Sequence, residues 1–144
     1  MAVGDITVFN RGIYTFGNNL NLASDTFRVY LMAGLTLNID TQHFLSDIVA
    51  NEIALTGYTA GGYTITTPTW TEDDTNDRSA WDFENPTWAS IAAGTINYAV
   101  VVKWTGVTTT SPLLFAIEAT NANGSSYTIT IPAGGILYLR KATA

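Results

Sequence analysis

Half of the acidic residues in this 144-residue chain lie in one segment, and clustered carboxylates could do chemistry. Such a cluster could bind calcium, which takes about six to eight oxygen ligands, or supply the acid and base of a glycosidase. The spacing does not match the common calcium-binding loop, and no glycine stands where that loop must turn. We interpret the segment as a solvated loop, with calcium binding as an alternative. The acidic residues are Glu72, Asp73, Asp74, Asp77, Asp82 and Glu84.

The only histidine, His43, stands near Ser46 and Asp47, which together have the residue types of a catalytic triad. Three neighbours on one helical turn cannot aim at a single reacting atom, so we interpret His43 as a surface residue. One histidine and no cysteine leave no donor set for a transition metal. We predict no catalytic residue, no metal site, no cofactor and no enzymatic activity. A carboxylate hydrolase using Asp73, Asp77 or Glu84 is a weaker alternative.

Aromatic residues are numerous, with four tryptophans and seven tyrosines. Exposed rings stack on sugar faces, but aromatic residues also fill cores and interfaces. Trp70, Trp81 and Trp88 flank the acidic segment and are candidate glycan contacts. Trp104 ends an apolar run and is predicted to lie in the core.

The composition restricts the possible partners. Charged residues make up only 12% of the chain, about half the usual share. A surface poor in charge is common in proteins that pack against neighbours in an assembly. The formal net charge of −6 disfavours nucleic acid as a partner. The apolar runs are far shorter than the roughly 20 residues that span a bilayer, so we predict no membrane contact. The first ten residues do not resemble a secretion signal, and we expect synthesis in the cytoplasm.

Alternation of apolar residues predicts a mainly β chain. Its clearest strand runs over residues 95–104, where both faces are apolar, so we expect a central strand there. Turn-forming residues separate the runs at intervals typical of an antiparallel β-sandwich or jelly roll. The other predicted strands cover residues 27–32, 63–69, 113–119, 127–131 and 136–140, with an interrupted edge strand from Trp81 to Ile91.

One segment departs from the strand pattern. Phe44, Leu45, Ile48 and Val49 have helical spacing, so we predict one short helix at about residues 41–50, capped by Asp40 or Thr41. Residues 1–20 are predicted to form an N-terminal arm or edge strand, and residues 21–144 a single β-sandwich domain.

The order of these segments resembles a group of small tailed-bacteriophage virion proteins, several of which are similar to capsid decoration or cement proteins. The resemblance covers nearly the whole chain from about Asn10 and includes no catalytic motif. Arg28 stands where the resembling strand usually has lysine, and the acidic segment is longer than typical. The segments that carry the resemblance are Asp25 to Leu31, His43 to Ile48, Glu52-Ile53, Gly57 to Gly62, Trp88, Ala99 to Trp104, Pro112 to Glu118, Thr128 to Pro132 and Gly135 to Leu137.

This resemblance implies a decoration or cement protein on the virion head surface, made in the host cytoplasm. Its expected partner is the major capsid protein, and its expected state is a homo-oligomer, a trimer or dimer at a symmetry axis. We predict that the arm contacts the capsid through Phe9, Tyr14 and Phe16, because an apolar arm that contains glycine can order on binding. The alternative is a tail- or fibre-associated module that binds host surface glycans through the tryptophans named above.

Overall fold

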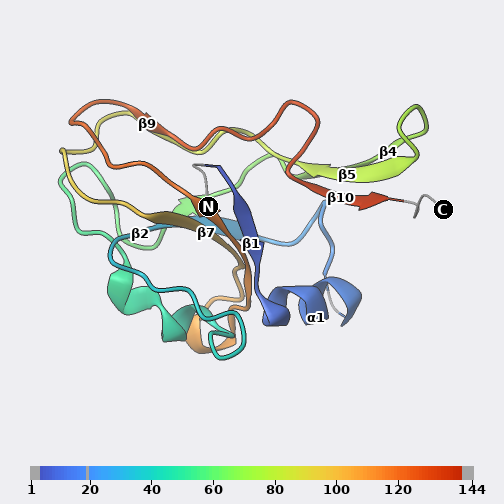
Figure 1. Ribbon diagram of the computed structural model, residues 1–144, viewed down its shortest axis with the longest axis horizontal. Helices are drawn as coiled ribbons and strands as arrows, with labels where there is room; N and C mark the ends of the chain where they lie inside the picture. The colour runs from blue at the N-terminus through green and yellow to red at the C-terminus, as the bar shows by residue number, and fades with distance from the viewer. Residues whose placement is uncertain (1–3, 19, 141–144) are drawn as a thin grey trace.

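The structure is a computed structural model that describes residues 4–18 and 20–140, and its described elements are mainly antiparallel strands. Figure 1 shows the elements in layers, with one sheet above another and short helices below. In chain order they are β1 (Ile6–Val8), α1 (Asn10–Asn18), β2 (Phe27–Met32), η1 (Leu45–Asp47), η2 (Val49–Asn51), β3 (Tyr63–Thr64), β4 (Thr69–Asp73), β5 (Arg78–Asp82), β6 (Thr87–Trp88), β7 (Tyr98–Lys103), η3 (Thr108–Thr110), β8 (Leu113–Glu118), β9 (Tyr127–Thr128) and β10 (Leu137–Arg140).

The main sheet has five strands in the order β1-β8-β7-β2-β3. The central strand is β7, which pairs antiparallel with β2 on one side and β8 on the other. Its residues Ala99 to Val102 are all fully buried, since both faces of the sheet are covered. The prediction of a central strand in residues 95–104 is therefore confirmed.

Alternate residues of the main sheet enter two separate hydrophobic clusters. Ala99 and Val101 face the cluster beneath the second layer of strands, whereas Val100 and Val102 face the cluster covered by the helical turns. This division follows from the two-residue period of a strand. The second layer consists of the three-stranded sheet β10-β5-β4 and the pair β6-β9. The chain is therefore a β-sandwich-like body with helical segments on its outer face.

The helical segment predicted at about residues 41–50 forms two single turns of 3-10 helix, η1 and η2. Its fully buried residues Leu45 and Ile48 are three positions apart, which places them on one side of a 3-10 helix. Asp47 accepts hydrogen bonds from the backbone N–H groups of His43 and Phe44, at 2.8 and 2.9 Å, so the predicted caps Asp40 and Thr41 do not cap this segment. Phe44 pairs with Pro112 in an isolated bridge, which keeps the entry to η1 extended.

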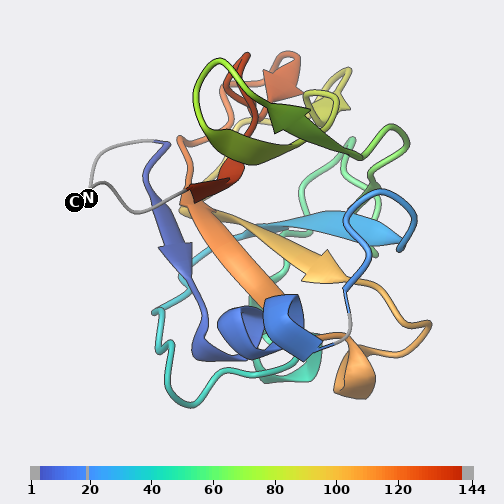
Figure 2. The ribbon, with the colours of Figure 1, turned by 90° about the vertical axis from the view of Figure 1, so that its right-hand side faces the viewer.

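The α-helix of the described chain lies instead at Asn10–Asn18, in the segment predicted as an arm or edge strand. Within that segment β1 is an edge strand paired with β8, and α1 packs against β8. Gly12 lies directly against the backbone of Leu114, and a side chain at that position would overlap its carbonyl oxygen. Figure 2 shows α1 beneath the strands, on the side of the molecule that faces the viewer. The described part of residues 1–20 is therefore packed onto the domain.

Candidate functional site

The three aromatic residues predicted to contact a capsid occupy different environments. Phe9 is fully buried in the core, so it is not available as a surface contact and that prediction is wrong. Tyr14 is 57% exposed and lies beside Arg11, whose guanidinium carbon is 5.0 Å from the centre of its ring. Phe16 is partly buried at the edge of the core. Each residue of an α-helix is rotated by about 100° from the one before it, so Tyr14 and Phe16, two positions apart in α1, face nearly opposite directions.

The three tryptophans predicted to contact glycans also differ in burial. Trp81 is fully buried and donates its indole N–H to the carbonyl oxygen of Leu22 at 2.8 Å. Trp88 is 9% exposed and is surrounded by tyrosine rings in the core. Neither indole can stack on a sugar in solution, so a glycan site made of all three tryptophans is ruled out. Trp70 is partly buried and lines a surface groove. Trp104, predicted to be in the core, packs at its margin under the Arg28 guanidinium, 4.2 Å from the ring centre.

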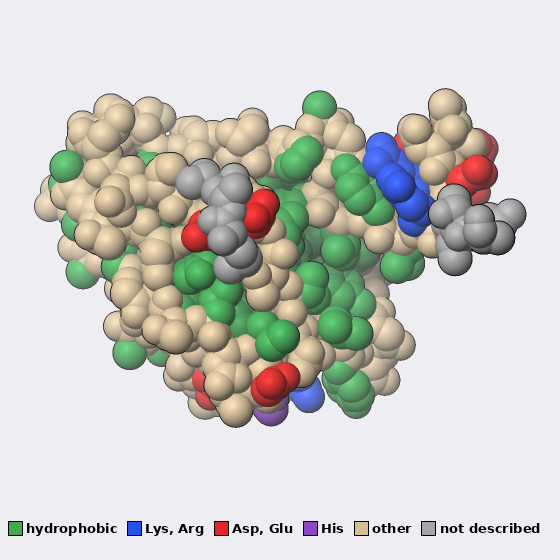
Figure 3. Space-filling model, in the orientation of Figure 1, with side chains coloured by type: hydrophobic (Ala, Val, Ile, Leu, Met, Phe, Trp, Pro, Cys, Tyr) green, Lys and Arg blue, Asp and Glu red, His purple; other side chains and the backbone are tan. Residues whose placement is uncertain are grey.

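A mainly apolar hollow on the described surface lies between α1 and the three-stranded sheet. We call it the α1–β10 groove, and its volume is about 330 Å³. Figure 3 shows hydrophobic side chains gathered there, right of the centre of the view. Ile13 and Leu139 on its two sides are 61% and 69% exposed, far more than large aliphatic residues of a core. The lining residues are Val8, Ile13, Phe16, Leu20, Leu22, Trp70, Leu137, Tyr138 and Leu139.

The strand register explains why this groove exists. Leu137 pairs with Trp81 and Trp81 with Trp70, so these residues share the inner face of the three-stranded sheet. Further along the same face, Leu139 pairs with Ser79, beyond the end of the core. The sheet therefore extends past the body and leaves an apolar surface above α1.

An acidic surface adjoins the open end of the groove. A second hollow of about 320 Å³ shares Leu139 with the groove and is otherwise lined by the β4–β5 hairpin. Its carboxylates are Glu72, Asp73, Asp74 and Asp77. This segment was predicted as a solvated loop, whereas the structure forms most of it into two paired strands around a short turn. The carboxylates thus lie on a paired hairpin and its turn, at one end of an apolar groove.

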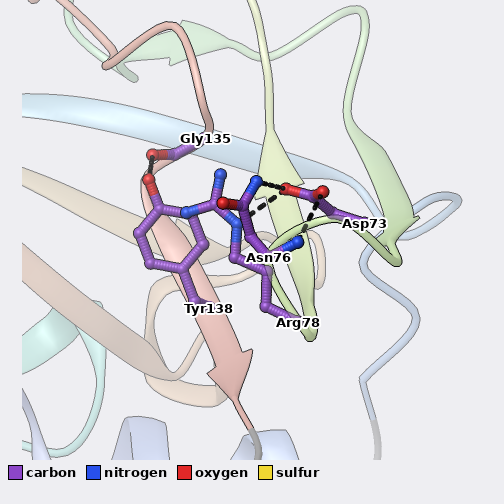
Figure 4. A network of polar contacts seen from close by, with 5 residues as sticks. All are labelled: Asp73, Asn76, Arg78, Gly135 and Tyr138. Atoms are coloured by element: carbon purple, nitrogen blue, oxygen red, sulfur yellow. Dashed lines mark hydrogen bonds and ion pairs between the residues drawn. The ribbon is translucent and has the colours of Figure 1, made fainter.

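One of these carboxylates supports the hairpin itself. Asp73 accepts hydrogen bonds from the Asn76 amide at 2.7 Å and from Arg78 Nε at 2.9 Å, and these bonds lower its pKa. The Arg78 guanidinium also lies over the Tyr138 ring, whose hydroxyl donates to the carbonyl oxygen of Gly135 at 2.7 Å. Figure 4 shows this network joining the hairpin turn to β10. The network positions β10, which forms one side of the groove.

Glu84 also has a structural role. Its two carboxylate oxygens accept hydrogen bonds from both the backbone N–H and the hydroxyl of Thr66 and of Thr67, at 2.6 to 3.0 Å. The backbone N–H groups of these threonines are therefore not available to pair with a strand. The strand predicted over residues 63–69 is accordingly divided into β3 and β4.

The same contacts predict a pH dependence of stability. Burial raises the pKa of Glu84, but the hydrogen bonds from Thr66 and Thr67 outweigh it and lower the pKa from 4.5 to about 2. A carboxyl whose pKa is lower in the folded state stabilises the fold above its unfolded pKa, and this stability is lost as the pH falls. We expect the free energy of unfolding to decrease between about pH 4.5 and pH 2. Denaturant titrations across that range measure this change.

Glu84→Gln should reduce the free energy of unfolding at neutral pH by about 1 kcal/mol, a modest loss because solvent screens part of the charge. The free energy of unfolding should also depend less on pH in the acidic range. Glu72→Gln is the matched control, since Glu72 is exposed and its carboxylate has no hydrogen bond or ion pair among the described residues. An unchanged acidic slope in Glu84→Gln would show that this interaction does not cause the pH dependence.

The remaining sequence candidates are the histidine and a metal site. His43 is exposed, and its Nε2 lies 2.9 Å from the carbonyl oxygen of Asp40. Over residues 4–18 and 20–140, no group of three or more His, Cys, Asp or Glu side chains is arranged to hold a metal ion. No helix in the described ranges is long and apolar enough to cross a membrane.

Comparison with known proteins adds no assignment, since no family model, curated protein or solved structure matches the chain. The groove brings together Phe16 and Trp70, which the sequence placed in two different hypotheses. Sequence reasoning missed Ile13 and Leu139, the most exposed residues of the lining. The alternation of Leu137 and Leu139 in a terminal strand was the available signal, because it aligns both on one face.

Proposed function

We propose that this protein is a structural subunit of a tailed-bacteriophage particle and acts as a decoration or cement protein on the head surface. The observation that supports this role best is the α1–β10 groove, an exposed apolar surface on a β-sandwich-like body. Apolar patches rimmed by polar residues are typical of protein interaction sites. The low charge content and the sequence resemblance to phage virion proteins point to the same role.

In this role the protein stabilises the shell by bridging neighbouring capsid subunits. Each copy contributes a modest contact through the groove, with the major capsid protein as the partner. Several copies around a symmetry axis must detach together, so dissociation is slow even when each contact is weak. No reactive group is needed for this activity. The protein is then made in the host cytoplasm and binds the head after the head has assembled.

The test is to mix purified protein with undecorated shells of the phage that encodes it. Saturable cosedimentation at a fixed ratio to the capsid subunit is the expected result. The coated shells should also melt at a higher temperature, because a ligand that binds only the folded assembly stabilises it. Shells that neither bind the protein nor gain stability would contradict the proposal.

The glycan-binding alternative now has only Trp70 from its original set on the surface. A change in tryptophan fluorescence on adding host polysaccharide would support that alternative. The decoration proposal predicts no such change.

A further inference from the structure

The free edge of β10 forms one side of the α1–β10 groove. β10 is the outer strand of the sheet β10-β5-β4, and within the described residues its second edge has no strand partner. An exposed edge offers backbone donors and acceptors to an added strand. Side chains that alternate along such a strand then enter pockets beside the edge. The groove beside β10 is lined by apolar side chains from α1, β4 and β10 itself.

The end of the groove differs from its centre in charge. Glu72 lies on the same face of the sheet as Leu139, since both residues oppose Ser79 in the register. Asp74 and Asp77 lie in the turn beside it, and none of the three acids has an ion-pair partner among the described residues. Arg78 also lines this hollow, but its guanidinium is engaged by Asp73 and by the Tyr138 ring. Beyond Leu139 the described surface therefore carries three unpaired carboxylates beside one internally paired arginine.

This charge pattern favours a basic partner over a second copy of the chain. The chain has six Lys and Arg residues, and four of them are already engaged with its own rings or carboxylates. Its net charge of −6 also opposes self-association at an acidic surface. The engaged residues are Arg11, Arg28, Arg78 and Lys103.

We propose that the α1–β10 groove receives an extended segment of the shell subunit that pairs with the free edge of β10. Apolar side chains of that segment occupy the groove, and a Lys or Arg near its end lies against Glu72, Asp74 and Asp77. Complementary charge fixes the direction and register of such a strand and speeds its association. This inference rests on the proposed function and names the chemistry of the contact.

A peptide probe tests the chemistry without the shell. The probe is a labelled synthetic peptide that alternates leucine and threonine and ends in two lysines, and its matched control ends in two glutamates. By fluorescence anisotropy, the lysine peptide should bind at least about tenfold more tightly than the glutamate peptide. Equal binding of the two peptides, or binding of neither, would overturn the inference.

Charge variants test the acidic end. The double variant Glu72→Gln with Asp77→Asn should reduce the preference for lysine, and Asn suits the positive φ of 49° at residue 77. The control, Thr109→Lys with Thr130→Lys, changes the net charge by the same amount at two exposed positions outside the groove. An equal loss of preference in both variants would show that overall charge, and not the acidic end, selects the peptide.

A groove variant separates this inference from the proposed function. Leu139→Asp should lower the affinity for shells at least about tenfold, whereas Val107→Asp, at another exposed apolar residue outside the groove, should not. Ile13→Asp provides a second groove variant that is also on the surface. If shells bind wild type and Leu139→Asp equally, the groove inference fails and the proposed function stands. If the lysine peptide binds but shells do not, the proposed function fails and with it the shell subunit as occupant, whereas the binding chemistry of the groove stands.

Sedimentation of the free protein tests whether a second copy of the chain occupies the groove. The inference predicts the same oligomeric state for wild type and Leu139→Asp. A wild-type dimer that Leu139→Asp converts to a monomer would show that a second copy fills the groove, which would overturn the proposal.

Discussion

Trp81→Ala should lower the free energy of unfolding by about 4 kcal/mol, the largest effect we expect from a single substitution. Trp81 is fully buried between the two sheets and contacts the rings of Phe27, Phe83 and Phe115 at centroid distances of 4.8 to 6.0 Å. Removing the indole leaves a cavity and an unpaired carbonyl oxygen on Leu22. Chemical denaturation followed by circular dichroism measures the change.

Trp70→Ala is the control for this substitution. Trp70 opposes Trp81 on the neighbouring strand but is only partly buried, so we expect a loss of about 1 to 2 kcal/mol. The pair also separates core from binding roles, because Trp70 lines the groove and Trp81 does not. Equal stability of the Trp81→Ala variant and wild type would contradict the position of Trp81 in the core.

Gly12→Ala should destabilise the protein by about 3 kcal/mol, even though alanine is the better helix former. The added methyl group would overlap the carbonyl oxygen of Leu114, so α1 must move away from β8. Because α1 provides one side of the groove, this variant should also lose affinity for its partner. Thermal denaturation measures the loss of stability, and cosedimentation with shells measures the loss of binding.

Gly17→Ala is the matched control in the same helix. Apart from its chain neighbours and the backbone of its own helix, no described atom lies within 4 Å of the position that its Cβ would occupy, so only helix propensity should act. We expect a gain of about 0.5 to 1 kcal/mol. A loss in Gly17→Ala as large as that in Gly12→Ala would show that contact with β8 is not the cause.

The sequence was most informative where burial on both faces made a strand apolar throughout. β2 and β8 lie within the segments predicted as strands, and β7 lies at the centre of its predicted segment. Short edge pairs such as β6 and β9 were overestimated in length, since their ladders end after two residues. Local alternation of apolar residues predicts that a segment joins a sheet, but it does not predict how many of its residues are paired.

The helical elements were less predictable. Gly12 and Gly17 lower the helix propensity of α1, and the close contact between Gly12 and β8 compensates for it through tertiary structure. The spacing of Leu45 and Ile48 fits both a 3-10 turn and an α-helix, so their periodicity could not distinguish the two.

The groove was only partly accessible from the sequence. Phe16 and Trp70 were recognised as candidate contacts, but 54 positions separate them along the chain. Their proximity depends on the extension of β10, β5 and β4 past the core above α1, which is a property of register and layer order. Phe9 and Trp81 have the same residue types as these contacts and are fully buried, so residue type alone could not separate surface from core.

Hydrogen exchange on shell-bound protein tests most directly whether this molecule acts through the surface formed by α1 and β10. The comparison is between free protein and protein saturated onto shells, followed by peptide-level mass spectrometry. We predict slower exchange in residues 137–140, where an added strand would bond the β10 edge, and in residues 10–18. Protection confined to other faces, with exchange at β10 unchanged by binding, would contradict the account.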